Sequence, residues 1–198
     1  DGLDYQPGND LLANRKMIHH KDTDPSLLYY NMFWNDGTMR IGGREYTSLV
    51  QSKCYTHGEM TCLSCHSLHS MEEPSKQLGY NMNTDQACIQ CHKEPQYTTQ
   101  LANHTHHQLN SEGSRCLNCH MPHTSYALMR GIRSHRIDSP MIRSNKKNEK
   151  PNACNLCHLD KTMQWTADNL SEWYGHPEVE LDEQHQNCLL YTSDAADE

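Results

Sequence analysis

The chain has 198 residues, of which 35% are hydrophobic even when its ten Cys are counted, and it contains a single Phe. So few aliphatic and aromatic side chains would make a thin core for this length, which indicates that another group supplies part of the apolar interior. The formal net charge of -8 gives no basic footprint for nucleic acid or an anionic membrane, and no apolar run approaches the roughly 18 residues that span a bilayer.

Three elements can be predicted outside the central part of the chain. Residues 26–41 place aromatic and apolar side chains on both sides of Asn35-Asp36-Gly37, which predicts a β-hairpin. Residues 44–54 show the spacing of a short amphipathic helix. Near the other end, one helical stripe ends at Gly175 and Pro177 and consists of Met163, Ala167, Leu170, Trp173 and Tyr174.

One short motif, Cys-x-x-Cys-His, occurs four times between these elements. Its starts are separated by 26, 28 and 38 residues, so the chain is not a solenoid of fixed period. We number the motifs by their cysteines and histidine: motif 1 (Cys62, Cys65, His66), motif 2 (Cys88, Cys91, His92), motif 3 (Cys116, Cys119, His120) and motif 4 (Cys154, Cys157, His158).

This motif is the attachment signature of c-type haem. Three residues make nearly one helical turn, so both sulfurs lie on one face and can form thioethers with one porphyrin, while the histidine that follows binds the iron. Four covalent haems would also supply the missing core. Zinc knuckles and a disulfide framework are the alternatives, but neither requires a histidine after every cysteine pair.

The four motif histidines are therefore the predicted proximal iron ligands, and eleven other histidines remain for the opposite faces. The predicted distal ligands are His69, His104, His107 and His135, with His123 in reserve. The predicted surface histidines are His19, His20, His57, His176 and His185. Arginines that bracket motif 3 are expected to pair with haem propionates or to form a solvated face: Arg115, Arg130, Arg133 and Arg136. Cys54 is expected to be a small buried residue.

The chain resembles the multihaem c-type cytochromes related to the tetrahaem electron acceptor of hydroxylamine oxidoreductase in nitrifying bacteria. It is most similar to larger bacterial members that continue into helical repeats. The resemblance covers residues 29–175. It rests on Asn35-Asp36-Gly37, residues 62–67, His104-Thr-His-His107, Gly113-Ser-Arg-Cys116 with Cys119-His-Met-Pro122, and Pro151-Asn-Ala-Cys154 through Trp173-Tyr-Gly175. It implies haem attachment and axial ligation at the matching positions, and electron transfer outside the cytoplasm.

We therefore expect a mainly α protein with long loops, little β structure and a multihaem cytochrome c architecture. The expected parts are an N-terminal segment (1–53), a tetrahaem domain (54–175), a linker toward a further C-terminal region (176–187) and an adapter-derived end (188–198). The first ten residues lack the sectors of a signal peptide, so we expect either a mature form or a fragment of a longer chain. The adapter-derived end favours the fragment, and Cys188 then carries no chemistry.

The expected function is electron transfer through four bis-histidine haems in a periplasmic or cell-surface redox chain, without catalytic residues of its own. Redox proteins are the expected partners. The main alternative is a multihaem reductase or oxidase of small nitrogen compounds with one five-coordinate iron, although Cys-x-x-Cys-Lys does not occur in the chain. A zinc-stabilised binding module is the third interpretation.

Overall fold

A computed structural model of the chain describes residues 6, 8–10, 13, 18–19, 31–40, 45–67, 77–126, 130–142 and 150–187. Within these ranges, short helices alternate with turns and long loops, as predicted. The α-helices are α2 (Glu45–Leu49), α3 (Lys53–Thr56), α4 (Gln86–Ile89), α5 (Leu101–Thr105), α6 (Cys116–His120), α7 (Met163–Tyr174) and α8 (Glu183–Asn187). Single turns of 3-10 helix lie at Cys62–Ser64, Pro95–Tyr97, Glu112–Ser114 and Cys154–Leu156.

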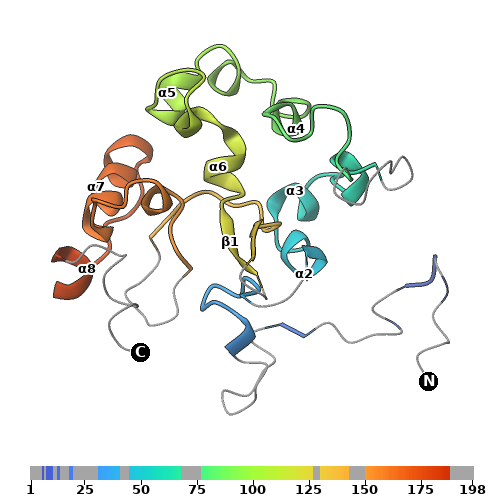
Figure 1. The fold of residues 1–198 in the computed structure, drawn as a ribbon, viewed down its shortest axis with the longest axis horizontal. Coiled ribbons are helices and arrows are strands. Elements are labelled where there is room, and N and C mark those ends of the chain that lie inside the picture. The colour runs from blue at the N-terminus through green and yellow to red at the C-terminus, as the bar shows by residue number, and fades with distance from the viewer. Residues whose placement is uncertain are drawn as a thin grey trace.

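The helices are arranged around motif 3. Figure 1 shows α6 and the β-hairpin that follows it near the centre, with α2 and α3 on one side and α7 and α8 on the other, while α4 and α5 form the top of the view. Every helix in the described ranges is too short or too polar to traverse a bilayer.

The β structure lies at a place that the sequence pattern did not indicate. Strands β1 (His123–Tyr126) and β2 (Arg130–Arg133) pair antiparallel directly after motif 3, with Thr124 opposite Ile132. The predicted N-terminal hairpin is present around its turn, where Phe33 and Met39 form an isolated antiparallel bridge. Gly37 has a φ of 83° there, a conformation that glycine adopts without strain.

The helix predicted over residues 44–54 is divided into α2 and α3. Ser52, the residue before α3, has extended backbone angles, with φ -76° and ψ 141°. Its side chain is buried and bonds to a distant segment. The break therefore comes from a tertiary contact that periodicity within the segment cannot reveal.

Helix α7 has the predicted extent. Thr162 caps its first turn by accepting a hydrogen bond from the Trp165 N–H, and Gly175 ends it in the left-handed conformation at φ 66°. Met163 and Leu170 of the predicted stripe are buried. Helix α8 packs against α7, and with the buried Leu181 before it it occupies part of the expected linker.

The side-chain core is thin. Among the described residues, seven hydrophobic side chains are buried, against nine polar ones. Several leucines beside the motifs are exposed instead, including Leu63 at 65%, Leu156 at 41% and Leu159 at 52%. Apolar side chains close to the cysteine motifs are therefore not buried by the described part of the protein. This is expected if attached groups contribute to the core.

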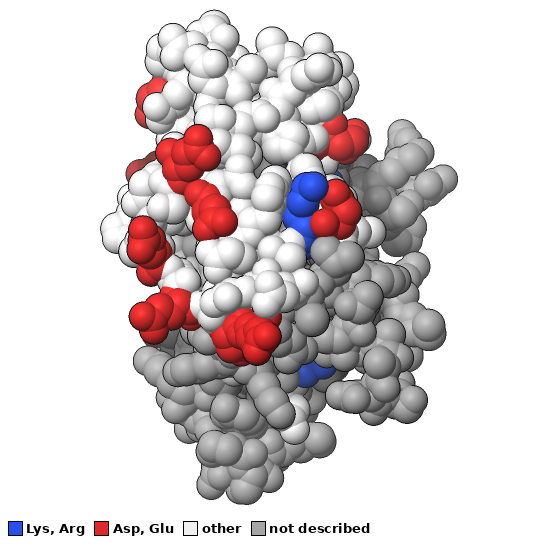
Figure 2. All heavy atoms as spheres, turned by 90° about the vertical axis from the view of Figure 1, so that its left-hand side faces the viewer, with Lys and Arg blue, Asp and Glu red and all other residues white. Residues whose placement is uncertain are grey.

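Negative charge collects on the α7 and α8 side of the molecule. Figure 2 shows acidic side chains spread over this face and little basic surface among the described residues. From Asp160 to Glu183, all seven Asp and Glu residues are exposed and the chain has one basic residue, Lys161. The excess of acidic residues in the composition is thus concentrated beside motif 4.

Candidate functional site

Each motif folds into a single helical turn. Motif 3 forms α6, motif 2 begins within α4, and motifs 1 and 4 begin in 3-10 turns. In motifs 1, 2 and 4 the histidine N–H donates to the carbonyl of the first cysteine, at 2.9, 3.0 and 2.9 Å. This turn places the two cysteines of a motif at neighbouring positions of one face, with the histidine directly after them.

Three of the four motif histidines face a second histidine from elsewhere in the chain. The pairs, with the distance between ring centroids, are pair 1 (His66 and His135, 6.2 Å), pair 3 (His120 and His104, 6.3 Å) and pair 4 (His158 and His107, 5.9 Å). The ring planes differ by 19°, 3° and 38° in the same order. His106, in contrast, lies flat on Trp173 with centroids 4.2 Å apart, so the paired rings are farther apart than rings in direct stacking contact.

The structure thus places three of the four predicted distal histidines opposite a motif histidine. The fourth, His69, lies outside the described residues. The motif 2 histidine, His92, has a ring contact with Tyr97 at 5.4 Å, and Tyr97 in turn contacts His104 at 5.1 Å. The reserve residue His123 is exposed in β1. Iron binding by these residues stays a prediction.

Hydrogen bonds set the orientation of three paired rings. In each case the Nδ1 atom lies beside a backbone carbonyl: His107 beside Thr105 (2.6 Å), His120 beside Asp138 (3.0 Å) and His135 beside Arg133 (3.1 Å). A carbonyl accepts and never donates, so Nδ1 carries the proton and Nε2 presents its lone pair. Nδ1 of His66 is buried without a hydrogen-bond partner among the described residues.

Burial keeps several of these rings neutral. It is the largest influence on the pKa of His120 and lowers it, although the hydrogen bond to Asp138 acts in the opposite direction. Burial likewise lowers the pKa of His135 and, together with the charges of His120 and His106, that of His104. A neutral imidazole is the form that binds a metal ion.

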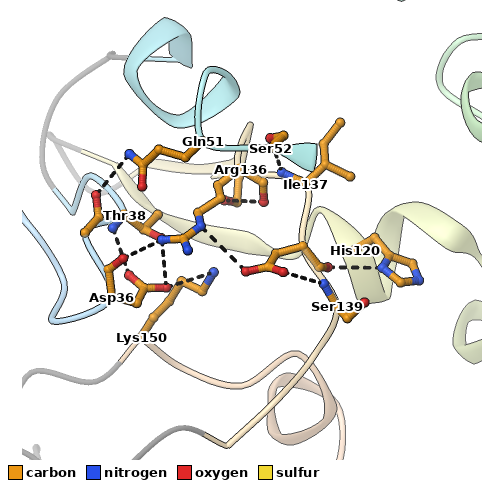
Figure 3. Close-up of polar contacts among 12 residues, drawn as sticks. Asp36, Thr38, Gln51, Ser52, His120, Arg136, Ile137, Ser139 and Lys150 are labelled. Atoms are coloured by element: carbon orange, nitrogen blue, oxygen red, sulfur yellow. Dashed lines mark hydrogen bonds and ion pairs between the residues drawn. The ribbon is translucent and has the colours of Figure 1, made fainter. Parts of the chain in front are cut away.

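A buried ion cluster lies next to motif 3 (Figure 3). The Asp36 carboxylate is 5% exposed and lies 3.5 Å from the Arg136 guanidinium and 3.6 Å from the Lys150 ammonium. Arg136 also lies 3.6 Å from the carboxylate of Asp138, whose carbonyl faces the motif 3 histidine. Burial opposes ionisation of Asp36, but Lys150, the hydrogen bonds from Thr38 and Arg136 together lower its pKa.

Helix α7 holds the segment formed by α5 and the residues after it, which carries two of the paired histidines. The Tyr174 hydroxyl donates to the His104 carbonyl at 2.7 Å, and Trp173 stacks on His106. At the other end of the helix, Trp165 contacts the motif 4 histidine with centroids 4.9 Å apart. Helix α7 therefore contacts the motif 4 histidine of pair 4, the residue next to its partner His107, and the backbone of His104 in pair 3.

Motif 4 is joined to α7 by buried side chains. The Thr166 hydroxyl donates to the Asn155 side-chain carbonyl at 2.7 Å, and the Asn155 amide donates to the Lys161 carbonyl at 3.1 Å.

Gly113 leaves space for the side chain of His107, because a Cβ atom at position 113 would overlap the imidazole ring. This overlap gives a physical reason for the glycine in the Gly-Ser-Arg-Cys sequence before motif 3.

Sequence reasoning missed the main contacts of Arg133. Its guanidinium donates to the carbonyls of Leu117 and Met121 at 2.9 and 3.1 Å, and to the side chain of Asn118 at 2.9 Å. Arg133 thus satisfies carbonyls at the end of α6. Arg115 donates to the Asn83 carbonyl at 2.8 Å. These partners are protein groups, and pairing of the arginines with haem propionates stays a prediction beside the solvated face.

The remaining predicted residues have less distinctive positions. Cys54 is half-buried. Of the predicted surface histidines, His57 is exposed, and three others are half-buried: His19, His176 and His185. His20 lies outside the described residues, and the side chain of Arg130 is also outside them.

The motifs lie close to one another in chain order. The Cys88 and Cys116 thiols of motifs 2 and 3 share a hydrogen bond, which raises the pKa of Cys88 and lowers that of Cys116. Burial and then the charge of Cys91 raise the pKa of Cys65, so the charge of a motif 2 cysteine acts on motif 1. Within the described ranges, His, Cys, Asp and Glu side chains form no group of three suited to hold a metal ion. The imidazoles that face each other there form pairs 1, 3 and 4.

Space for a bound group lies beside motif 1. A hollow of about 380 Å³ is lined by Leu63, Cys65, His66, Gly79 and Met82, with two serines. This volume is within the range of about 300–1,000 Å³ found for ligand pockets. The cysteines, the exposed leucines and the free Nε2 atoms of the paired rings all fit covalently attached haem.

Comparison with known proteins agrees with this chemistry. Residues 55–96 match a protein family described as the doubled CXXCH motif, and this range contains motifs 1 and 2. No curated protein and no solved structure matches the chain. Because CXXCH is the attachment sequence of c-type haem, these motifs imply covalently bound haem, and their doubling is characteristic of multihaem c-type cytochromes.

Proposed function

We propose that the chain is a tetrahaem electron-transfer segment, in which each motif attaches one haem and each iron has two histidine ligands. The observation that carries this proposal is the set of three histidine pairs. For the motif 2 iron we keep His69 as the proposed second ligand, because it follows the motif 1 histidine by three residues and can reach a neighbouring site.

The separation of the paired rings supports two-sided ligation. Imidazole nitrogens bind metals at about 2.0–2.1 Å, and the centroid of a five-membered ring lies about 1.1–1.2 Å behind each ring atom. Two rings that bind one metal ion from opposite sides therefore have centroids about 6.2–6.6 Å apart. Pairs 1 and 3 have this separation, and pair 4 is within half an ångström of it.

The hydrogen bonds of the rings support the same assignment. Histidine ligands usually donate their second N–H to a carbonyl or carboxylate, which fixes the tautomer, and three of the paired rings have this arrangement. Haem iron supplies one-electron oxidation and reduction when it is bound. Two protein ligands leave no position for a substrate, so the residues favour a carrier over an enzyme.

The arrangement of the motifs favours a continuous redox chain. The charges of cysteines in motifs 1 and 2, and in motifs 2 and 3, act on each other. The charge of Cys157 in motif 4 also acts on Cys119 in motif 3. Aromatic contacts connect the motif 2 histidine through Tyr97 to pair 3. Successive haems would therefore be neighbours, so an electron would pass between adjacent groups.

We further propose that the protein acts outside the cytoplasm, because haem is attached to c-type cytochromes after export. Its redox partners would be proteins. The acidic face of α7 and α8 (Figure 2) favours partners with a basic surface, because complementary charge accelerates and orients association.

Electron paramagnetic resonance of the oxidised protein tests the ligation. We expect low-spin ferric signals, and His135→Ala should convert about one quarter of the iron to the high-spin form if four haems are bound. His185→Ala is the control, because its partner is the exposed Asp182 at 2.6 Å. A large high-spin signal in the unaltered protein would favour the reductase or oxidase, and an unchanged spectrum after His135→Ala would reject pair 1.

A further inference from the structure

One buried hydroxyl connects two parts of the chain that are far apart in sequence. Ser52, the residue before α3, is 1% exposed. Its Oγ donates to the His135 carbonyl at 3.2 Å and accepts the Ile137 N–H at 2.9 Å. These two bonds fix the backbone on both sides of Arg136. Figure 3 shows the bond between Ile137 and Ser52.

The segment that Ser52 holds contributes to two different sites. His135 faces the motif 1 histidine in pair 1. Three residues later, Asp138 makes two bonds to the motif 3 histidine: its carbonyl accepts the His120 Nδ1–H at 3.0 Å, and its N–H donates to the His120 carbonyl at 3.2 Å. A displacement of residues 135–138 would therefore move the His135 ring of pair 1 and, at the same time, change the orientation of the His120 ring of pair 3.

The ion cluster fixes the middle of the same segment from the other side. Arg136 lies 3.5 Å from the Asp36 carboxylate and donates to the Thr38 hydroxyl at 3.3 Å. Ser52 thus provides the backbone anchor, and the N-terminal hairpin provides the side-chain anchor. Neither anchor touches the paired rings, so both act through the residues they hold.

We propose that Ser52 is a positioning residue that couples the histidine sites of motifs 1 and 3 through residues 135–138. This inference rests on the proposed function, because it assigns the two sites to iron ligands. Without the hydroxyl, the His135 carbonyl and the Ile137 N–H lose their buried partner. Unsatisfied buried groups are costly, so the segment would open more often.

The test compares Ser52→Ala and Ser52→Thr in the haem-loaded protein. Thr84→Ala is the matched control, since the Thr84 hydroxyl also donates to one carbonyl and accepts one N–H, but at an exposed position in the turn before α4. Amide hydrogen exchange should become about tenfold faster or more over residues 133–138 in Ser52→Ala. It should stay unchanged there in Thr84→Ala and return toward the original rate in Ser52→Thr.

The spectroscopic measurement is specific to the coupling. The low-spin signals of pairs 1 and 3 can be assigned by their loss in His135→Ala and His104→Ala. Ser52→Ala should shift both signals and leave that of pair 4 in place. A shift of one signal alone, or of all signals equally, would overturn the coupling.

The two proposals fail in different ways. If the unaltered protein lacks low-spin haem, the proposed function fails, whatever Ser52 does. If its spectrum is low-spin but Ser52→Ala changes neither exchange nor signals, the inference about Ser52 fails. If Ser52→Ala does not fold, amide exchange in the unaltered protein still tests whether the Ser52 hydroxyl holds the segment. Fast exchange of the Ile137 amide would show that it does not.

Discussion

The most informative stability prediction concerns Asp36→Asn. The substitution keeps the size of the side chain, and its carbonyl oxygen can still accept the Thr38 N–H, which donates to Asp36 Oδ1 at 2.8 Å. It removes the negative charge that faces Arg136 and Lys150, whose side chains are 12% and 16% exposed. Arg136 would then keep the carboxylate of Asp138, 3.6 Å away, while Lys150 would lose its ion pair with Asp36.

The size of the effect follows from the burial of the cluster. Breaking a buried ion pair by removing one partner costs about 3–5 kcal/mol. Arg136 and Lys150 keep some contact with water, so we expect the lower end, about 3 kcal/mol in the free energy of unfolding. For a chain of this length, about 2–4 °C of melting temperature is lost per kcal/mol, which predicts a decrease of about 6–12 °C.

The pH dependence provides a second, independent signature. The surroundings lower the pKa of Asp36 below its ordinary value of 3.8. A carboxyl group with a lowered pKa stabilises the fold above its unfolded pKa, and this contribution is lost as the pH falls through the folded pKa. The difference between the original protein and Asp36→Asn should therefore be full at pH 7, decrease as the pH falls below 3.8, and disappear below the folded pKa.

Urea unfolding followed by circular dichroism at pH 7 and at acid pH measures both effects. Asp160→Asn is the control, because Asp160 is exposed and pairs with the neighbouring Lys161 at 2.9 Å, so its midpoint should not change. Equal midpoints for the original protein and Asp36→Asn at pH 7 would refute the idea that this cluster fixes the hairpin to residues 136–138.

Two further substitutions test how the loop between motifs 2 and 3 is held. Tyr174→Phe removes the hydroxyl that binds the His104 carbonyl; we expect a loss of about 0.5–1.5 kcal/mol in unfolding free energy, with no loss for Tyr80→Phe, whose residue is 90% exposed. An unchanged urea midpoint for Tyr174→Phe would contradict the role of α7. Gly113→Ala forces the His107 ring away from the added Cβ, so a new high-spin signal from pair 4 should arise, and an entirely low-spin spectrum would show that the ring has room to adjust.

Local sequence signals were sufficient for the turn and the long helix. The Asn-Asp-Gly sequence at 35–37 specifies a tight turn through Gly37, and the periodicity of α7 ends at a glycine whose positive φ only this residue adopts easily. The structure also explains the aspartate of that turn, because the Asp36 carboxylate pairs with Arg136, which lies 100 residues later in the chain.

The rest depended on contacts that a linear pattern does not encode. Ser52 divides a predicted helix because its hydroxyl binds residues 83 and 85 positions later. The strands β1 and β2 have four residues each and no regular alternation of apolar side chains, so periodicity gave no signal for them. Histidine spacing indicated which residues were candidates for pairing, but which motif each one faces depends on how α5, α7 and residues 133–138 pack.

The number of covalent haems tests the central claim most directly. The chain is produced in cells that contain the c-type haem attachment machinery, and its intact mass is measured after denaturation. The mass should show four added haems, and the double variant Cys154→Ala, Cys157→Ala should carry three. A chain that carries two haems, confined to the doubled motif of residues 55–96, or none at all, would contradict the account.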